Sequence, residues 1–380
     1  MLVQFSVTNF RNFRDTATLD LSEAKITEFP EHLYRSSDGL GVLPMAALYG
    51  PNGSGKSNFL KAIWYLRSLV LEGTSHREDF PCFCFDDECR RSPVEFDMLF
   101  RIGEDEYEYQ LKLLQNSVLE ENLFGRSLDD DSFDVLFDRD QDGVFLCEAW
   151  EHTDVSLLSD ETPLLYFLGT RVKDSQIHAV LTYFRNMIFF SSDAPDITYI
   201  EEVLQIADLK ESLVSHLKTL CPDIADIRET SKTVILTHIN SDNSVQLPWK
   251  EESTGTRQLI SLLSCMLCAK KQKALLLADD PEIHLHPKVL GYLYRLASAS
   301  DNQAEGAQML TATHENSNMN NRIFRRDEIW LTAREEDGSS SLYILALFLK
   351  ENGEKVRKDE TYFKQYLEGR YGADPSDGTW

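Results

Sequence analysis

The chain has 380 residues, 42% of them apolar, and its 38 basic and 63 acidic side chains give a net charge of −25 at pH 7. This length and apolar content allow a sizeable core, either in one large α/β domain or in a domain with an insertion. The acidic excess argues against a broad nucleic-acid-binding surface, and neither a bilayer-spanning apolar run nor a signal peptide is recognisable.

The first predicted elements are two antiparallel strands, over residues 3–7 and 17–21, in which apolar and polar side chains alternate. Residues 9–13, N-F-R-N-F, lie between them and are predicted to form the corner that joins the two strands.

Residues 50–57 fit the phosphate-loop pattern G-x-x-x-x-G-K-[ST] in full. A predicted buried strand over 45–49 precedes them, and apolar residues at helical spacing over 58–66 follow. In that arrangement Lys56 reaches the β- and γ-phosphates and the Ser57 hydroxyl binds Mg²⁺, so ATP and Mg²⁺ are the predicted cofactors. The predicted nucleotide-binding residues of this segment are Gly50, Pro51, Asn52, Gly53, Ser54, Gly55, Lys56, Ser57 and Asn58.

A hairpin is predicted over residues 94–102 and 107–113, which alternate on either side of a turn. Upstream of it, Cys82, Cys84 and Cys89 lack the paired spacing of a zinc site, and no suitable histidine follows nearby. The seven cysteines of the chain are unpatterned, which indicates reduced thiols in a cytoplasmic protein. Because no apolar run is long enough to span a bilayer, no membrane partner is predicted.

Asp138, Asp140 and Asp142 begin like a calcium-binding loop, but Ala149 occupies the twelfth position, where such a loop needs a bidentate glutamate. The flanks are typical of strands rather than helices. We therefore predict a solvated hairpin turn that ends at Gly143.

Apolar residues return to helical spacing in the middle of the chain, for example over 200–207 and 213–217. We predict an N-terminal ATPase lobe over 1–150, a helical insertion over 151–232, and a C-terminal ATPase lobe over 233–380.

A strand is predicted over residues 233–238, and residues 253–256 begin an apolar helix. Ser253 by itself is an ordinary helix cap. Small residues at a helix N-terminus also allow backbone amides and a hydroxyl to meet a γ-phosphate bound by another subunit.

Residues 275–279 form an apolar Walker B strand that ends in Asp279, which is predicted to hold Mg²⁺ through water. Asp280 follows at the position where a glutamate usually polarises the attacking water. Its side chain is one methylene shorter, and a displacement of about 1 Å can cost on the order of a hundredfold in rate. We predict slow hydrolysis, unless Glu282 or a shift of the strand compensates.

His284 and His286 form an H-x-H pair that could bind zinc, although L-H-P after the acidic pair is more typical of a D-loop. His314 ends another buried strand, and a lone histidine at such a place is usually structural. The last predicted elements are two strands and the turn between them, over residues 327–332, 341–345 and 337–338.

Taken in order, F-x-V-x-N-F-R-N-F at the start, GPNGSGKSN, ES-x-G-T, the Walker B strand and the histidine strand resemble the head domains of ABC-type ATPases of the RecF and SMC kind. The ending, V-R-K at 356–358 and Y-L-E-G-R-Y-G-A-D-P at 366–375, resembles bacterial ATPases of the RloA and AbiL type, related to the PtuA ATPase of the Septu system. Several of these belong to antiphage or abortive-infection operons.

The resemblance implies roles for residues outside the phosphate loop. Arg11 would belong to the nucleotide-binding lobe, and His314 would be the switch histidine that bonds the γ-phosphate, beside Asp280 and Glu282 as the other catalytic candidates. The ABC signature would consist of Ser253, Thr254, Gly255 and Thr256.

Two departures from the family pattern argue against brisk turnover but not against nucleotide binding. Asp280 replaces the usual glutamate, and no glutamine occurs between Ser57 and Gln110, where transporter-type ABC domains have one that touches the metal.

The predicted fold is therefore α/β, an ABC-type P-loop ATPase head with a mixed sheet lobe, a parallel-sheet core and a helical insertion. The predicted function is a nucleotide-dependent switch, a head-to-tail dimer or higher oligomer that controls a separately encoded effector, such as a nuclease, in antiphage defence. One alternative is a RecF-like DNA-binding repair ATPase with a local basic groove, and another is an assembly scaffold that hardly hydrolyses ATP.

Overall fold

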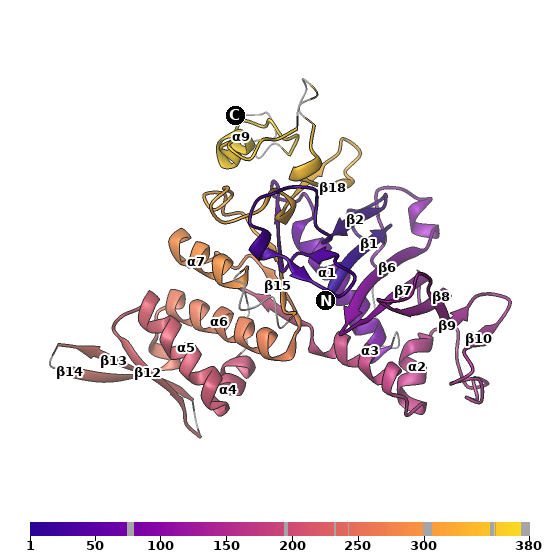
Figure 1. The fold of residues 1–380 in the computed structure, drawn as a ribbon, viewed down its shortest axis with the longest axis horizontal. Helices are drawn as coiled ribbons and strands as arrows, with labels where there is room; N and C mark the ends of the chain where they lie inside the picture. Colours follow the sequence, from indigo (N-terminus) through magenta and orange to yellow (C-terminus); the bar gives the residue numbers. More distant parts are fainter. Residues whose placement is uncertain are drawn as a thin grey trace.

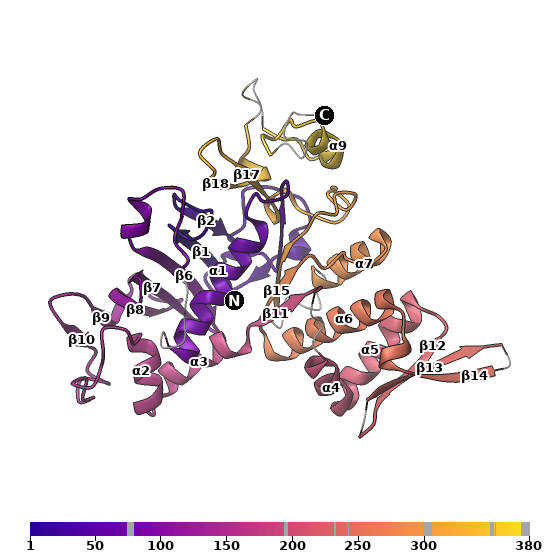
Figure 2. The same cartoon turned by 180° about the vertical axis from the view of Figure 1, so that it is seen from behind.

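The computed structural model describes residues 1–73, 80–193, 197–231, 233–241, 243–298, 306–349, 353 and 355–373. Two β-sheets lie in the middle of the molecule, and helix α1 (Lys56–Glu72) packs between them (Figure 1; Figure 2 shows the reverse side). The last two residues of the C-terminal motif, Asp374 and Pro375, lie outside the described residues.

The first sheet is antiparallel, in the strand order β10-β9-β8-β7-β6-β1-β2. It confirms the predicted opening pair as β1 and β2, and the predicted hairpin as β6 and β7. Its alternating sequences arise because one face packs on α1 while the other meets solvent. The strands are β1 (Leu2–Thr8), β2 (Ala17–Asp20), β6 (Val94–Ile102), β7 (Asp105–Leu114), β8 (Ser117–Ser127), β9 (Asp134–Arg139) and β10 (Val144–Leu146).

The second sheet, called the core sheet below, has the order β11-β15-β16-β5-β17-β18. The first five strands are parallel, and β18 closes the sheet antiparallel to β17. All the strands predicted around the phosphate loop, Walker B and the histidine are confirmed here. The strands are β5 (Met45–Tyr49), β11 (Ile188–Ser191), β15 (Leu275–Asp279), β16 (Gln308–Ala312), β17 (Ile329–Arg334) and β18 (Ser340–Ile344).

Alternate residues of β5 face two separate hydrophobic cores. Ala46 and Leu48 face the core shared with the antiparallel sheet and α1, whereas Met45, Ala47 and Tyr49 face the core on the other side. Each fully buried large apolar side chain stabilises the fold by about 1.5–3 kcal/mol. The core sheet is thus held from both sides, which gives the segments at its strand ends a rigid support.

The segment 151–232 contains four helices, α2 (Leu164–Arg171), α3 (Ser175–Asn186), α4 (Thr198–Gln205) and α5 (Ala207–Leu220). It is not purely helical, because it also supplies β11 to the core sheet. The division at residues 150 and 232 stays a prediction. The other helices in the described residues are α6 (Thr254–Gln272), α7 (Pro287–Ala297) and α9 (Tyr362–Leu367), with 3₁₀ turns at Pro30–His32, Cys89–Arg91, Trp249–Glu251, Arg326–Glu328 and Leu345–Leu347.

A third sheet of β12 (Ile224–Glu229), β13 (Val234–Asn240) and β14 (Asn243–Pro248) lies beyond α4 and α5, at the opposite end of the molecule from β8–β10 (Figures 1 and 2). We call this sheet the arm. The strand predicted over 233–238 is β13, and it pairs with its sequence neighbours rather than with the core sheet. Its neighbours in the sequence satisfy the backbone hydrogen bonds of β13 within the arm. The side chains of Val234 and Leu236 are buried in the second core. A small fourth sheet pairs β3 (Tyr34–Arg35) with β4 (Gly41–Val42).

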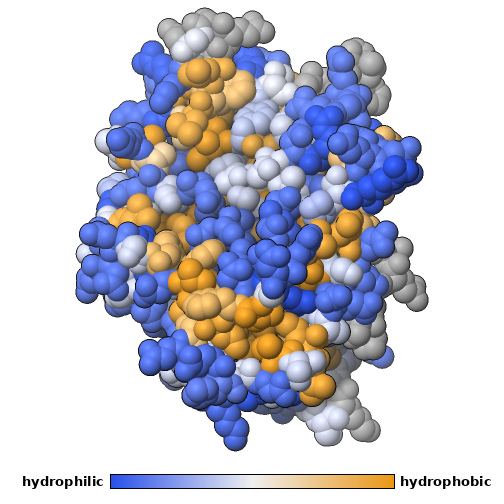
Figure 3. All heavy atoms as spheres, turned by 90° about the vertical axis from the view of Figure 1, so that its right-hand side faces the viewer, coloured by the Kyte–Doolittle hydropathy of each residue, from blue (hydrophilic) through white to orange (hydrophobic). Residues whose placement is uncertain are grey.

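Figure 3 faces the side of the molecule on which β9 and β10 lie in Figure 1. Hydrophilic residues cover much of this side, and apolar patches lie between them.

Residues 129–161 carry many aspartates and glutamates, and their one Lys or Arg is Arg139. Its guanidinium is not free, because it donates to the carbonyls of Thr162 and Ser159. This region therefore repels a phosphate backbone.

In the part of the chain that the structure describes, no helix combines the length and the hydropathy that a membrane span requires. The predicted fold class is confirmed: an α/β chain with an antiparallel sheet lobe, a mainly parallel core sheet and helices around them.

Candidate functional site

Three strand ends meet at one edge of the core sheet. Leu48 of β5 lies beside Ala312 of β16, and Ala312 lies beside Asp279 of β15. Beyond this row, the Thr313 N–H donates to the Leu48 carbonyl at 3.1 Å and the Asp280 N–H donates to the Ala312 carbonyl at 3.0 Å. Because parallel strands open at the same edge, the phosphate loop, the acidic pair and the histidine segment come together there.

The phosphate loop has little room for side chains at its ends. Gly55, the residue before α1, has φ +105°, and a Cβ at this position would collide with the side-chain amide of Asn12. A Cβ on Gly50 would collide with Thr332 of β17, whose hydroxyl also lies 2.5 Å from the Ser54 hydroxyl. Glycine is therefore required at both ends. The tip of the loop consists of Pro51, Asn52 and Gly53, of which the last two are exposed.

The Lys56 side chain lies inside the loop and is 3% exposed. Its Nζ donates to the carbonyls of Gly50 at 2.8 Å and Pro51 at 3.0 Å. Burial lowers the pKa of Lys56 to about 8, although the carboxylates that follow β15 act in the opposite direction. The amine thus lies where the loop would hold a phosphate, opposite the acidic residues.

Asp279 and Asp280 each present a carboxylate oxygen, Oδ1, that is buried without a hydrogen-bond donor among the described residues. Burial raises the pKa of Asp279, a hydrogen bond from the Ser57 hydroxyl lowers it, and the neighbouring Asp280 raises it again. Carboxylate and hydroxyl oxygens are the ligands that Mg²⁺ prefers. The donor set of Ser57 and Asp279 therefore fits Mg²⁺, which would also relieve the repulsion between the two aspartates.

Asp280 has a left-handed backbone, with φ +49°, a conformation that aspartate adopts more readily than most residues. The His314 Nε2 lies 3.7 Å from its Oδ1. Burial and the charge of Lys56 lower the pKa of His314, whereas Asp280 opposes them. The imidazole of His314 and the side chain of Asp280 therefore lie together near the Lys56 amine.

Both carboxylate oxygens of Glu282 are engaged. Oε1 accepts the His314 N–H at 2.5 Å, and Oε2 accepts the Thr313 hydroxyl at 2.8 Å. Burial raises the pKa of Glu282, while these hydrogen bonds lower it. This geometry suits a residue that positions the end of β16 rather than a free base, and the catalytic role of Glu282 stays a prediction.

The predicted signature forms the start of α6. Ser253 caps the helix, since its Oγ accepts the Thr256 N–H at 3.1 Å, and the side chains of Ser253 and Thr254 are exposed. A Cβ on Gly255 would lie 2.8 Å from the His284 carbonyl, so the signature packs closely on the segment after Walker B. Among the described residues, no hydrogen bond joins residues 253–256 to the phosphate loop of the same chain.

The N-terminal corner is attached to the start of α1. Arg11 Nη1 donates to Asn58 Oδ1 at 3.1 Å, and Asn58 Nδ2 donates to Asn12 Oδ1 at 2.7 Å. Asn12 Nδ2 in turn donates to the Ser340 hydroxyl at 2.5 Å. Arg11 is thus exposed and bonded to Asn58 at the start of α1, and its part in nucleotide binding stays a prediction.

Sequence reasoning missed Asn12, Thr332 and Thr313, which support the loop and the histidine segment. Thr332 and Thr313 belong to no motif with a recognisable spacing, and Asn12 lies in the opening motif without a role of its own. The one signal was the polar Asn12 within an aromatic corner.

The patterns set aside as metal sites have other contacts. Asp140 Oδ1 accepts the N–H groups of Asp142 and Gly143 in the β9–β10 turn, which confirms the predicted hairpin. His286 caps α7 by accepting the Lys288 N–H at 3.1 Å. Among the described residues, no group of three or more His, Cys, Asp or Glu side chains is placed to hold a metal ion.

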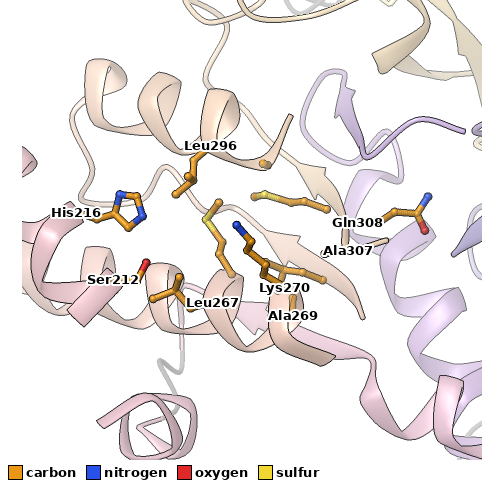
Figure 4. A pocket seen from close by; sticks show the side chains of 12 residues that line it. Ser212, His216, Leu267, Ala269, Lys270, Leu296, Ala307 and Gln308 are labelled. Carbon is orange, nitrogen blue, oxygen red and sulfur yellow. The ribbon is translucent and has the colours of Figure 1, made fainter. Parts of the chain in front are cut away.

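A cavity of about 60 Å³ lies between α5, α6 and the start of β16, away from the phosphate loop (Figure 4). Its polar lining consists of Ser212 and His216 of α5, Lys270 of α6 and Gln308 of β16, and the rest is mostly apolar. Binding pockets for small molecules usually have about 300–1,000 Å³. This cavity is therefore a packing space and not the nucleotide site.

Comparison with known proteins agrees with this geometry. Residues 45–320, from the strand before the phosphate loop to beyond the histidine segment, match a protein family described as "AAA domain, putative AbiEii toxin, Type IV TA system". No curated protein matches the chain. Among solved structures, the SMC head domain from Thermotoga maritima is similar, with 13% identity and a TM-score of 0.47 over 90% of this chain and 98% of that one.

Proposed function

Since the chain belongs to the family of AAA domains described as putative AbiEii toxin, Type IV TA system, and is thus an ATPase of the AAA and ABC-like type, we propose that it acts as an ATP-driven switch. The observation that carries the proposal is the meeting of Lys56, the Asp279–Asp280 pair and His314 at one edge of the core sheet.

In this proposal the β- and γ-phosphates bind in the loop, where Lys56 and the N-terminus of α1 neutralise their charge. Ser57 and Asp279 would hold Mg²⁺, which when bound supplies further positive charge to the phosphates. Asp280 would accept a proton from the attacking water, and His314 would donate a hydrogen bond to the γ-phosphate from its place beside Asp280.

Hydrolysis is proposed to be slow. The Asp280 carboxylate is one methylene shorter than that of glutamate, and Glu282, the nearest alternative, has both oxygens engaged by Thr313 and His314. A misplaced base of this kind can cost on the order of a hundredfold in rate.

The exposed start of α6 supports a dimer. Ser253 and Thr254 have free surface, while no described hydrogen bond ties them to their own phosphate loop. We propose that each signature faces the nucleotide of a second copy, so that two ATP molecules are enclosed in a head-to-tail dimer. In this form the dimer would be the active state that engages an effector.

The biological role is part of the same proposal. The family description refers to a toxin, and the C-terminal sequence resembles antiphage ATPases of the RloA, AbiL and PtuA type. We propose a cytoplasmic defence protein that controls a separately encoded effector, such as a nuclease.

A scaffold that uses ATP for assembly with almost no hydrolysis is the second candidate, and the short Asp280 side chain favours it. A DNA-repair head is less well supported, because the acidic region of residues 129–161 opposes binding of a phosphate backbone there.

The experiment that tests the proposal is light-scattering mass with and without ATP–Mg²⁺, on wild type and Lys56→Ala, with phosphate release followed in parallel. The switch predicts a mass that doubles with ATP in wild type and slow phosphate release, and no response in Lys56→Ala. Doubling without any release would favour the scaffold, and an unchanged wild-type mass would contradict the ATP-driven dimer.

A further inference from the structure

His238 of the arm lies between two carboxylates. Its Nδ1 is 2.8 Å from Asp223 Oδ2, and its Nε2 is 2.6 Å from Glu252 Oε1. The two partners differ in exposure: the Asp223 side chain is 62% exposed, whereas that of Glu252 is 3% exposed. The bond to Glu252 is therefore the one that is shielded from water, where a charge-assisted hydrogen bond is strongest.

Glu252 is the residue directly before the predicted signature. Its successor Ser253 caps α6, and its own N–H donates to the Trp249 carbonyl at 3.3 Å in the turn that leaves the arm. A buried carboxylate at this position needs a partner, because burying an unpaired charge costs several kcal/mol of folding free energy. His238 supplies that partner and so determines where the chain enters α6.

The arm itself provides the support for His238. In β13 this residue pairs with Ile224 of β12 and Val245 of β14, and two residues earlier Leu236 is fully buried in the second core. The imidazole is thus attached to a sheet that packs against the body, while the signature side chains are exposed. The contact between His238 and Glu252, called the His238 bridge below, therefore joins the arm to the residue directly before the signature.

We propose that His238 is a positioning residue for the ABC signature: through Glu252 it holds Ser253 and the start of α6 in the orientation that meets the nucleotide of a second copy. This inference rests on the proposed head-to-tail dimer. If His238 has this role, a partner protein that binds the arm and shifts β13 would alter ATP hydrolysis without contacting the nucleotide.

The test uses mixed dimers of the full chain. His238→Ala by itself is expected to reduce ATP hydrolysis roughly tenfold or more, as loss of a hydrogen bond to a charged group does, while ATP still binds to its intact phosphate loop. Lys56→Ala is inactive because it cannot bind ATP. When the two are mixed, each mixed dimer contains one intact loop opposite one intact signature, so activity should rise clearly above that of either variant alone, with roughly half of the wild-type activity per mixed dimer as the upper limit.

A purely structural defect in His238→Ala gives no such recovery, because its own intact loop would then sit in a damaged subunit. Recovery therefore supports the positioning role, and absence of recovery overturns it. His238→Gln, whose amide can still donate to Glu252, should retain more activity than His238→Ala. Should His238→Ala fold poorly, Glu252→Gln, which keeps the side-chain shape, is mixed with Lys56→Ala in the same way and read by the same rule.

Two controls separate this inference from the proposed function. Thr254→Arg places a bulky cation at an exposed signature position, and it should also recover when mixed with Lys56→Ala. If Thr254→Arg recovers and His238→Ala does not, the dimer stands and the positioning role falls. If neither recovers, the shared-site dimer itself is contradicted. His216→Ala, which removes a histidine bonded to Tyr292 at 2.7 Å, should hydrolyse ATP like wild type.

Discussion

Glu282 Oε1 accepts the backbone N–H of His314 at 2.5 Å, which joins the turn after β15 to the end of β16. The same carboxylate accepts the Thr313 hydroxyl. Glu282 and His314, which the sequence marks as separate catalytic candidates, are thus joined by a hydrogen bond, and His314 Nε2 lies 3.7 Å from Asp280 Oδ1. The position of His314 therefore depends on Glu282.

Replacing Glu282 should separate positioning from base catalysis. Glu282→Ala leaves the hydroxyl of the buried Thr313 without its acceptor, which costs about 1–3 kcal/mol, and also removes the acceptor of the exposed His314 N–H. Glu282→Gln keeps one carbonyl oxygen for the His314 N–H and should lose much less stability and turnover. Denaturant unfolding and steady-state ATP hydrolysis of both variants check this. If Glu282→Gln is as inactive as Glu282→Ala while remaining fully folded, Glu282 acts as a base.

Asp280→Glu should increase turnover, by up to about a hundredfold, because the longer side chain reaches the water that the short one misses. The same change should slightly lower the free energy of unfolding, because glutamate tolerates the left-handed backbone at φ +49° less well than aspartate. Phosphate release measures the turnover, and thermal unfolding of the same preparation measures the stability. Asp280→Asn is the matched control, and it should reduce turnover while keeping the backbone preference.

Gly55→Ala should impair both folding and nucleotide binding. A Cβ on Gly55, which precedes α1, costs about 1–2 kcal/mol for the left-handed backbone alone. It also collides with the side chain of Asn12 in the N-terminal corner. Gly39→Ala isolates the first effect, because Gly39 has φ +79° with nothing within 4 Å of the added atom. Calorimetric unfolding should show a larger loss for Gly55→Ala, and equal losses would mean that Asn12 moves aside freely.

The His238 bridge should make stability depend on pH. Burial by itself lowers the pKa of His238, but the hydrogen bonds and charges of Glu252 and Asp223 outweigh it and the pKa is raised above 6.5. Cys221 is the other titratable group nearby, and burial raises the pKa of its thiol.

A raised pKa in the folded chain means that the bridge contributes fully below pH 6.5 and loses its contribution as the pH rises through the raised value. The difference in unfolding free energy between wild type and His238→Gln should therefore shrink as the pH rises above 6.5. Urea unfolding at a series of pH values measures it. A difference that stays constant over this range would show that the imidazole is not protonated in the bridge.

The sequence by itself determined the local units of this protein. The strand, loop and helix around Lys56, the hairpin of β6 and β7, and the strand that ends in Asp279 all follow from apolar periodicity, glycine positions and charge within short segments. Each of these signals acts between residues that are close along the chain, so it can be read without knowing the rest of the fold.

The tertiary structure alone decided which of these units meet. The place of β16 between β5 and β15 brings His314 to Asp280, and the long chain separations involved leave no periodic trace in the sequence. The same holds for Asn12 against Gly55, for Glu282 against His314, and for β13 joining the arm so that His238 reaches Glu252. These contacts depend on strand order and on the burial of two cores at once, because packing selects among arrangements that local preferences leave equally open.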